Sequence, residues 1–161
     1  MSSSVPKGRA QKVASIHIPN LPEYVLMDSF KTPLIVAGRI LLALLFLLAG
    51  IDKLVDVAGT AGYIASVGLP AASALAVLSG VFEVLAACAL IVGWQARWAA
   101  LSLALFTLVT NVLFHNYWAL PDAEVYMAQI KFMKNLSIVG GMLVVAALGA
   151  GPLSLDARRA H

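Results

Sequence analysis

The chain has 161 residues, of which 61% are hydrophobic and 12% are charged, and its formal net charge is +3. Soluble domains carry about 25% charged and about 45–50% apolar residues, so this balance excludes an ordinary soluble protein and indicates an integral membrane protein. The basic residues form no long stripe, and we expect no nucleic-acid partner. The single cysteine, Cys88, excludes an internal disulfide within these residues.

Residues 1–31 are predicted to form a polar and amphipathic N-terminal tail. Its basic residues, such as Lys7 and Arg9, precede a segment that is broken by Pro19 and Pro22. That segment has no apolar core of the kind found in signal peptides, so we expect no cleavable signal. We expect the tail to lie on the membrane surface or on a partner, with a long helix disfavoured there.

Residues 32–152 are predicted to form a transmembrane domain of four helices, and the fold class is therefore all-α. Roughly 20 apolar residues in a helix cross the hydrocarbon core of about 30 Å. The expected spans are 33–53, 71–92, 98–114 and 133–148. Residues 55–70 are less apolar and end at Gly68-Leu69-Pro70, which predicts a short interfacial helix between the first two spans. Residues 153–161 form a C-terminal tail.

The basic residues predict the orientation in the membrane. With four spans, both termini and the 93–97 turn lie on one side. That side collects Lys7, Arg9, Lys12, Lys31, Arg97, Arg158 and Arg159, with Arg39 just inside the first span. The other side has only Lys53, Lys131 and Lys134. The positive-inside rule then predicts a cell-membrane protein with cytoplasmic N- and C-termini.

An ordered set of short motifs resembles the DoxX family of small four-helix membrane proteins, over roughly residues 34–156. The motifs are Gly38-Arg39-Ile40-Leu41, Ala49-Gly50-Ile51-Asp52-Lys53-Leu54, Ser66-Val67-Gly68-Leu69-Pro70, Glu83-Val84-Leu85, Phe114-His115-Asn116-Tyr117-Trp118, Lys134-Asn135-Leu136 and Gly151-Pro152-Leu153-Ser154-Leu155-Asp156. The resemblance implies a link to redox chemistry, because the namesake is the small subunit of a membrane thiosulfate:quinone oxidoreductase. It therefore implies a quinone as the expected cofactor.

Glu83 is predicted to lie in the middle of the second span, where an unpaired charge is costly and usually marks function. It shares one helix face with small residues such as Ala76 and Gly80, so we expect it to point into the bundle. Arg39 is expected at a similar depth in the first span, and we predict an Arg39–Glu83 ion pair. Two interpretations stay open: a pair that only fixes helix register, and a proton relay to a quinone.

The candidate catalytic residues are Glu83, His115 and Lys134. Thr107, Asn111 and His115 follow at four-residue steps on the third helix. Since the third and fourth helices are expected to be antiparallel neighbours, we predict that His115 and Lys134 lie at one depth. His115 can donate a hydrogen bond to a quinone oxygen and exchange a proton.

Four further residues are expected to bind the cofactor: Asn111, Asn135, Trp118 and Lys131. Each also has a structural interpretation, because aromatic residues anchor helices at the interface and lysines near helix ends extend toward the headgroups. No close set of metal ligands, nucleotide fingerprint or Fe–S cysteine set is seen, so we expect no metal or nucleotide.

The sequence thus favours the membrane subunit of a quinone-linked redox system, and it leaves open whether the chain is itself an enzyme. Beyond the lipid bilayer, the expected partners are a redox protein or further copies of the chain. The alternative function is a non-catalytic membrane scaffold that anchors a partner enzyme. A small transporter or channel ranks last, because four helices leave little lumen and no inverted repeat is visible.

Overall fold

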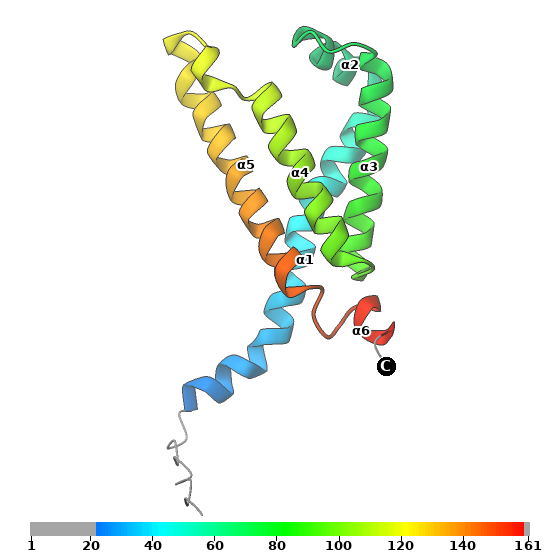
Figure 1. Cartoon of the computed structure of the whole chain (residues 1–161), viewed down its shortest axis with the longest axis vertical. Coiled ribbons are helices and arrows are strands. Elements are labelled where there is room, and N and C mark those ends of the chain that lie inside the picture. Colours follow the sequence, from blue (N-terminus) through cyan, green and yellow to red (C-terminus); the bar gives the residue numbers. More distant parts are fainter. Residues whose placement is uncertain (1–21, 160–161) are drawn as a thin grey trace, which may run out of the picture.

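A computed structural model of the chain describes residues 22–159, which form an all-α bundle (Figure 1). Its elements are α1 (Pro22–Val55), α2 (Val57–Ser66), α3 (Ala72–Val92), α4 (Ala96–Phe114), the 3-10 turn η1 (Tyr117–Ala119), α5 (Asp122–Leu148) and α6 (Leu155–Arg159). Among the described residues, four helices are long and apolar enough to cross a membrane: α1 from Ser29, α3, α4 with the turn after it, and α5. The predicted all-α membrane bundle is confirmed, and α2 is the expected short helix between the first two spans.

The first helix begins earlier than predicted, at Pro22 instead of residue 33. Pro22 occupies the first helical position, where its missing N–H costs nothing, and no proline or glycine interrupts the ten residues that follow. Pro33 therefore lies inside the helix, where proline removes a backbone hydrogen bond and favours a bend. Figure 1 shows the first turns of α1 bending away from the bundle. The rest of the predicted tail, residues 1–21, lies outside the described residues.

The helices pack as two pairs, α1 with α3 and α4 with α5, and α2 packs on α3. The chain turns sharply from α3 into α4 at Gly93, whose φ of +69° suits a residue without a side chain. From this turn the α4–α5 pair and α3 diverge toward α2 (Figure 1). We call the two ends of the bundle the turn end, at residues 93–95, and the α2 end.

The core fills the half of the bundle near the turn end. Its largest fully buried apolar side chains are Leu90, Leu103 and Met142. Alanines surround them, which lets the helices approach closely, as is typical of packing inside membranes. The α2 end is less tightly filled, and the open space of the bundle is found there.

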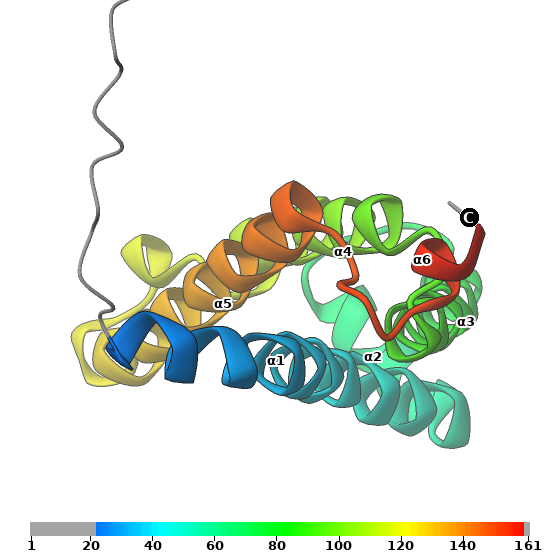
Figure 2. The ribbon, with the colours of Figure 1, turned by 90° about the horizontal axis from the view of Figure 1, so that it is seen from below.

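The C-terminal segment is fastened across the turn end, as the view from below shows (Figure 2). The Asp156 carboxylate accepts hydrogen bonds from the backbone N–H groups of Gln95 and Ala96, at 2.8 and 2.9 Å. A carboxylate at the first turn of α4 satisfies unpaired N–H groups and complements the helix dipole. The Asp156 N–H in turn donates to the carbonyl of Gly93 at 2.9 Å. These bonds hold the chain after α5 against the start of α4.

Candidate functional site

A buried ion pair joins α1 and α3. The Lys53 Nζ lies 2.7 Å from the Glu83 Oε2, and the Glu83 side chain is only 5% exposed. The pair forms because α1 and α3 cross closely at two glycines: a Cβ on Gly50 would lie 2.8 Å from the carbonyl oxygen of Gly80. Because α1 and α3 run antiparallel, Glu83 lies beside Gly50, with its Cβ 3.0 Å from a Cβ placed on that glycine, and Lys53 lies one turn nearer the α2 end and reaches back to the carboxylate.

The direction of the Lys53 side chain is unusual for its position. Lysines near the end of a membrane helix normally extend outward to the headgroups. Lys53, in the last turn of α1, instead points back along its helix, where Nζ also donates to the Ala49 carbonyl at 3.3 Å. Placing a charge toward the apolar interior is costly, and such residues usually serve a function.

The predicted Arg39–Glu83 pair does not form. Arg39 is 3% exposed and its guanidinium donates to the carbonyl oxygens of Ala150, Leu153 and Ile91, so it fastens the C-terminal segment to α3. The depth estimate failed because it took residue 33 to be level with the end of α3, whereas α1 continues beyond that end and Arg39 itself is level with Ile91. Arg39 faces Ile91, and Glu83 lies eight residues earlier in α3, which is about 12 Å along the helix axis.

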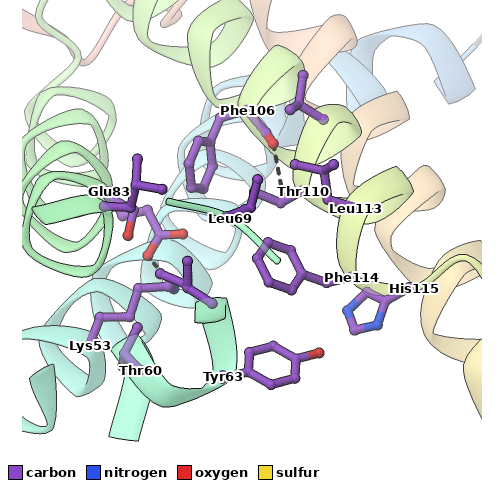
Figure 3. Close-up of a pocket in the computed structure, with 14 residues that line it drawn as sticks. Lys53, Thr60, Tyr63, Leu69, Glu83, Phe106, Thr110, Leu113, Phe114 and His115 are labelled. Carbon is purple, nitrogen blue, oxygen red and sulfur yellow. Dashed lines mark hydrogen bonds and ion pairs between the residues drawn. The ribbon is translucent and has the colours of Figure 1, made fainter. Parts of the chain in front are cut away.

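The ion pair lines a cavity of about 370 Å³ at the α2 end (Figure 3). Small-molecule sites are typically ~300–1,000 Å³, mostly apolar, with a few polar groups that orient the ligand. This cavity has that composition. Its polar side chains are those of Lys53, Thr60, Tyr63, Ser79, Glu83, Thr110 and His115. The remaining lining is apolar and includes Phe106, Phe114, Ile64 and Leu69.

Four elements build the walls of the cavity. Lys53 comes from α1, Tyr63 from α2, Glu83 from α3, and Phe114 and His115 from the end of α4. The rings of Tyr63 and Phe114 stack with centroids 5.2 Å apart, which joins α2 to α4 across the cavity. Figure 3 shows the His115 ring beyond Phe114, on the far side from Glu83. The cavity therefore depends on the arrangement of the whole α2 end.

His115 and Lys134 are not brought together. His115 lines the cavity, whereas Lys134 lines a separate shallow groove with Gln129, Ile130, Met133 and Ser137, all on α5. The two helices are antiparallel neighbours as predicted, but Lys134 is exposed on α5 and is not part of the cavity lining.

Asn111 and Asn135 meet, but at a helix contact and outside the cavity. Asn111 is fully buried and accepts a hydrogen bond from the Asn135 amide at 2.9 Å. Its own amide donates to the Phe132 carbonyl at 3.1 Å. This geometry describes a polar link between α4 and α5.

Trp118 and Lys131 also lie outside the cavity lining. Trp118 is 59% exposed, and its ring packs edge-on against those of Tyr117 and Phe132. Lys131 is exposed on α5. An exposed tryptophan beside a tyrosine at a helix end has the usual arrangement of an interfacial anchor.

Sequence reasoning named Glu83 and His115 but missed Lys53 as the partner of Glu83. The signal was present: Gly50 and Lys53 share one face of the first span, and Gly80 and Glu83 share one face of the second. Pairing the glycines as the point of closest approach would have placed Lys53 and Glu83 one turn to either side of it, a separation that the long lysine side chain can bridge. Within residues 22–159, no group of three or more His, Cys, Asp or Glu side chains is arranged to hold a metal ion.

Comparison with known proteins gives consistent matches. The family model described as DoxX matches residues 34–116. The inner membrane protein YphA of Escherichia coli is 34% identical over 86% of this chain and 99% of its own length. The inner membrane protein YqjF of the same organism is 36% identical over 76% of this chain and 88% of its own. The yeast ER-derived vesicles protein ERV29 is 26% identical over 82% of this chain but only 36% of its own. No solved structure matches the chain.

Proposed function

The chain belongs to the DoxX family of integral membrane proteins, and from that premise we propose that it is the membrane subunit of a redox system and binds a quinone in the cavity of Lys53, Glu83 and His115. The observation that carries the proposal is the charged pair at the inner end of an apolar cavity. A structural pair between two helices needs no cavity beside it. A site for a flat, mostly apolar ligand with two carbonyl oxygens needs both the polar pair and the apolar cavity.

The residues of the cavity fit a quinone headgroup. The Lys53 ammonium and the His115 ring supply hydrogen-bond donors for carbonyl oxygens, and the two lie at opposite sides of the cavity. The rings of Phe106, Phe114 and Tyr63 supply aromatic walls against which a flat ring stacks. Bound there, a quinone would supply two-electron chemistry that is coupled to proton uptake at its oxygens.

The contribution of this chain would be to position the headgroup and to exchange protons. Glu83 is held beside Lys53, so a proton can pass between the carboxylate and a ligand oxygen without leaving a lone charge in the membrane. His115 lies near the end of α4, closer to the membrane surface, and an imidazole there can exchange protons with water. Most of the cavity wall is apolar, which disfavours bulk water beside the headgroup.

The first test is the quinone content of the protein purified gently from its native membranes, measured by mass spectrometry of extracted lipids. We expect close to one quinone per chain, and at least a fivefold lower content in His115→Ala and in Lys53→Met. The matched control is Lys134→Met, which removes a lysine outside the cavity and should retain the wild-type content.

Two results would contradict the proposal. One is a wild-type protein without quinone. The other is equal loss in Lys134→Met and in the cavity variants, which would locate the quinone elsewhere. Co-purification of a partner polypeptide without quinone would favour the alternative, a scaffold for a partner enzyme. The observation behind that alternative is the start of α1, which extends beyond the bundle (Figure 1).

A further inference from the structure

The cavity holds a charged pair at one end, and at its other end His115 lies beside apolar side chains. Its inner end holds the ion pair, where the Glu83 Oε2 is bonded to Lys53. The second carboxylate oxygen accepts no hydrogen bond from the described residues and is directed into the cavity (Figure 3). One turn before Glu83, the hydroxyl of Ser79 donates to a carbonyl of its own helix, which leaves its lone pairs free to accept. These acceptors suit a headgroup that carries a hydrogen-bond donor, such as the hydroxyl of a reduced quinone.

The opposite end opens between α3 and α4. Leu75, Val109 and Leu113 line the cavity and are nevertheless 37%, 50% and 40% exposed, so they form its mouth. Val109 lies five residues before the end of α4, which is about 8 Å below that end along the helix axis. Both helices belong to membrane spans, so the mouth extends down into the hydrocarbon region and faces lipid.

The packing of the helices explains why this side is open. α3 packs mainly against α1, and α4 packs mainly against α5, so the two pairs touch each other chiefly near the turn end. Toward α2 they diverge (Figure 1), and α5 contributes nothing to the cavity wall. On the aqueous side α2 covers the gap with Ile64, which is 7% exposed, and with Tyr63, whose ring stacks on Phe114 although the residue is 53% exposed.

We infer that the cavity is loaded sideways from the bilayer, through a mouth formed by Leu75, Val109 and Leu113, and that its ligand is an amphiphile whose apolar tail stays in the lipid. The inference takes its ligand class, a quinone, from the proposed function. It adds that the ligand has an apolar tail and that it enters from the bilayer. A water-soluble ligand would need a polar path past α2, whereas the walls there carry the Tyr63–Phe114 stack. A tailed ligand reaches the ion pair without leaving the hydrocarbon phase.

The route is tested first without any ligand. In the Cys88→Ala background, Val109→Cys is labelled with a bimane fluorophore, and the protein is reconstituted into phosphatidylcholine vesicles. We expect strong quenching by a doxyl-labelled phosphatidylcholine and little quenching by aqueous iodide. The opposite pattern would overturn the lateral mouth, whichever ligand the cavity takes.

The ligand is tested next with two quinones that share a headgroup, one with a decyl tail and one without a tail. Binding is measured as the ligand-induced rise in Tm, which reports affinity for the folded state. Val109→Trp, which fills the mouth, should weaken binding of the tailed quinone at least tenfold and leave the tail-less quinone within twofold. The matched control is Val112→Trp, because Val112 is 47% exposed on α4 but does not line the cavity.

The outcomes separate the two proposals. If both quinones bind the wild type and Val109→Trp weakens neither, the quinone site stands and the lateral route is wrong. If neither quinone binds the wild type, the proposed function is wrong, and the assignment of a tailed quinone as the ligand is wrong with it. Equal weakening by Val109→Trp and Val112→Trp would also overturn the assignment of the mouth.

Discussion

The two members of the Lys53–Glu83 pair differ in how they can respond to the loss of the other. The Lys53 side chain is 28% exposed and sits in the last turn of its helix, so without Glu83 it can extend to the interface. The Glu83 side chain is 5% exposed in mid-span and has no such route. The pair should therefore show an asymmetric response to mutation.

We expect Lys53→Met to lower the free energy of unfolding by about 3 kcal/mol, since it leaves the buried Glu83 carboxylate without its charged partner. Glu83→Gln should cost ~1 kcal/mol or less, because the amide still accepts a hydrogen bond and the lysine can move. The double variant Lys53→Met/Glu83→Leu should be more stable than Lys53→Met alone. Reversible unfolding in mixed micelles, followed by circular dichroism, measures all three. Equal costs for the two single variants would show that the pair is not asymmetric.

Asn111 gives a second expectation for a single residue. Asn111→Leu removes an acceptor for the Asn135 amide and a donor to the Phe132 carbonyl, all within the α4–α5 contact. Hydrogen bonds between membrane helices are worth ~0.6 kcal/mol on average and up to about 1.7, so we expect a loss of ~1–2 kcal/mol for the two bonds.

The control for Asn111 lies on the same helix. The Ser102 hydroxyl donates to the Ala99 carbonyl within α4, so Ser102→Ala breaks no contact between helices and should change the Tm little. If the two variants unfolded alike, the Asn111–Asn135 link would not stabilise the bundle. Loss of quinone from Asn111→Leu, with stability unchanged, would instead return Asn111 to the binding site that the sequence predicted.

At the scale of the elements, the crossing of α1 and α3 positions the site. A methyl group on Gly50 would lie 2.8 Å from the Gly80 carbonyl oxygen and 2.9 Å from a Val84 methyl carbon, so Gly50→Ala must push the helices apart. We expect it to lower the Tm and to weaken the Lys53–Glu83 pair. Gly38→Ala is the matched control on the same helix, because nothing lies within 4 Å of a Cβ there.

Helix propensity sharpens this comparison. Alanine is favoured over glycine in a helix by about 1 kcal/mol, so Gly38→Ala should be neutral or stabilising. Gly50→Ala has the same intrinsic gain and should nevertheless destabilise. Thermal unfolding of the two variants, side by side, measures the difference. A stabilised Gly50→Ala would mean that α1 and α3 do not cross as closely as the structure places them.

The helices were predictable because each carries its own signal. Long apolar runs, the Gly68-Leu69-Pro70 stop and the turn at Gly93 lie in the local sequence, and they predicted the helices and their order. The start of α1 was missed, because Pro33 suits a first turn as well as it suits a bend. Local rules do not distinguish the two.

The pairing of side chains was less predictable, because it depends on where two helices cross. Arg39 and Lys53 both lie on the face of α1 that turns to the bundle, and either is a reasonable partner for Glu83 by composition. The choice is made by the register between α1 and α3, which the Gly50–Gly80 contact sets. Arg39 then faces the carbonyl groups of the C-terminal segment, and no sequence motif predicts this role.

For the whole molecule, the balance of charge between the two ends predicts the orientation in the membrane. In the described part of the chain, the turn end carries Lys31, Arg97, Arg158 and Arg159. At the α2 end, Lys53 is paired inward with Glu83, which leaves Lys131 and Lys134 as the exposed cations of that end. The positive-inside rule counts lysines and arginines regardless of their partners, and by that count the turn end carries more of them than the α2 end. We therefore expect the turn end and the C-terminus to face the cytoplasm.

Cysteine labelling tests this orientation directly. In the Cys88→Ala background, Val67→Cys lies between α2 and α3, and Arg159→Cys lies in α6; both positions are exposed. A membrane-impermeant maleimide added to intact spheroplasts should label position 67 and should reach position 159 only after permeabilisation. The reverse pattern would place α2 on the cytoplasmic side. Because the mouth at Val109 lies near the α2 end, the reverse pattern would also move lateral loading to the cytoplasmic leaflet. The labelling therefore decides which side of the membrane supplies protons to the site.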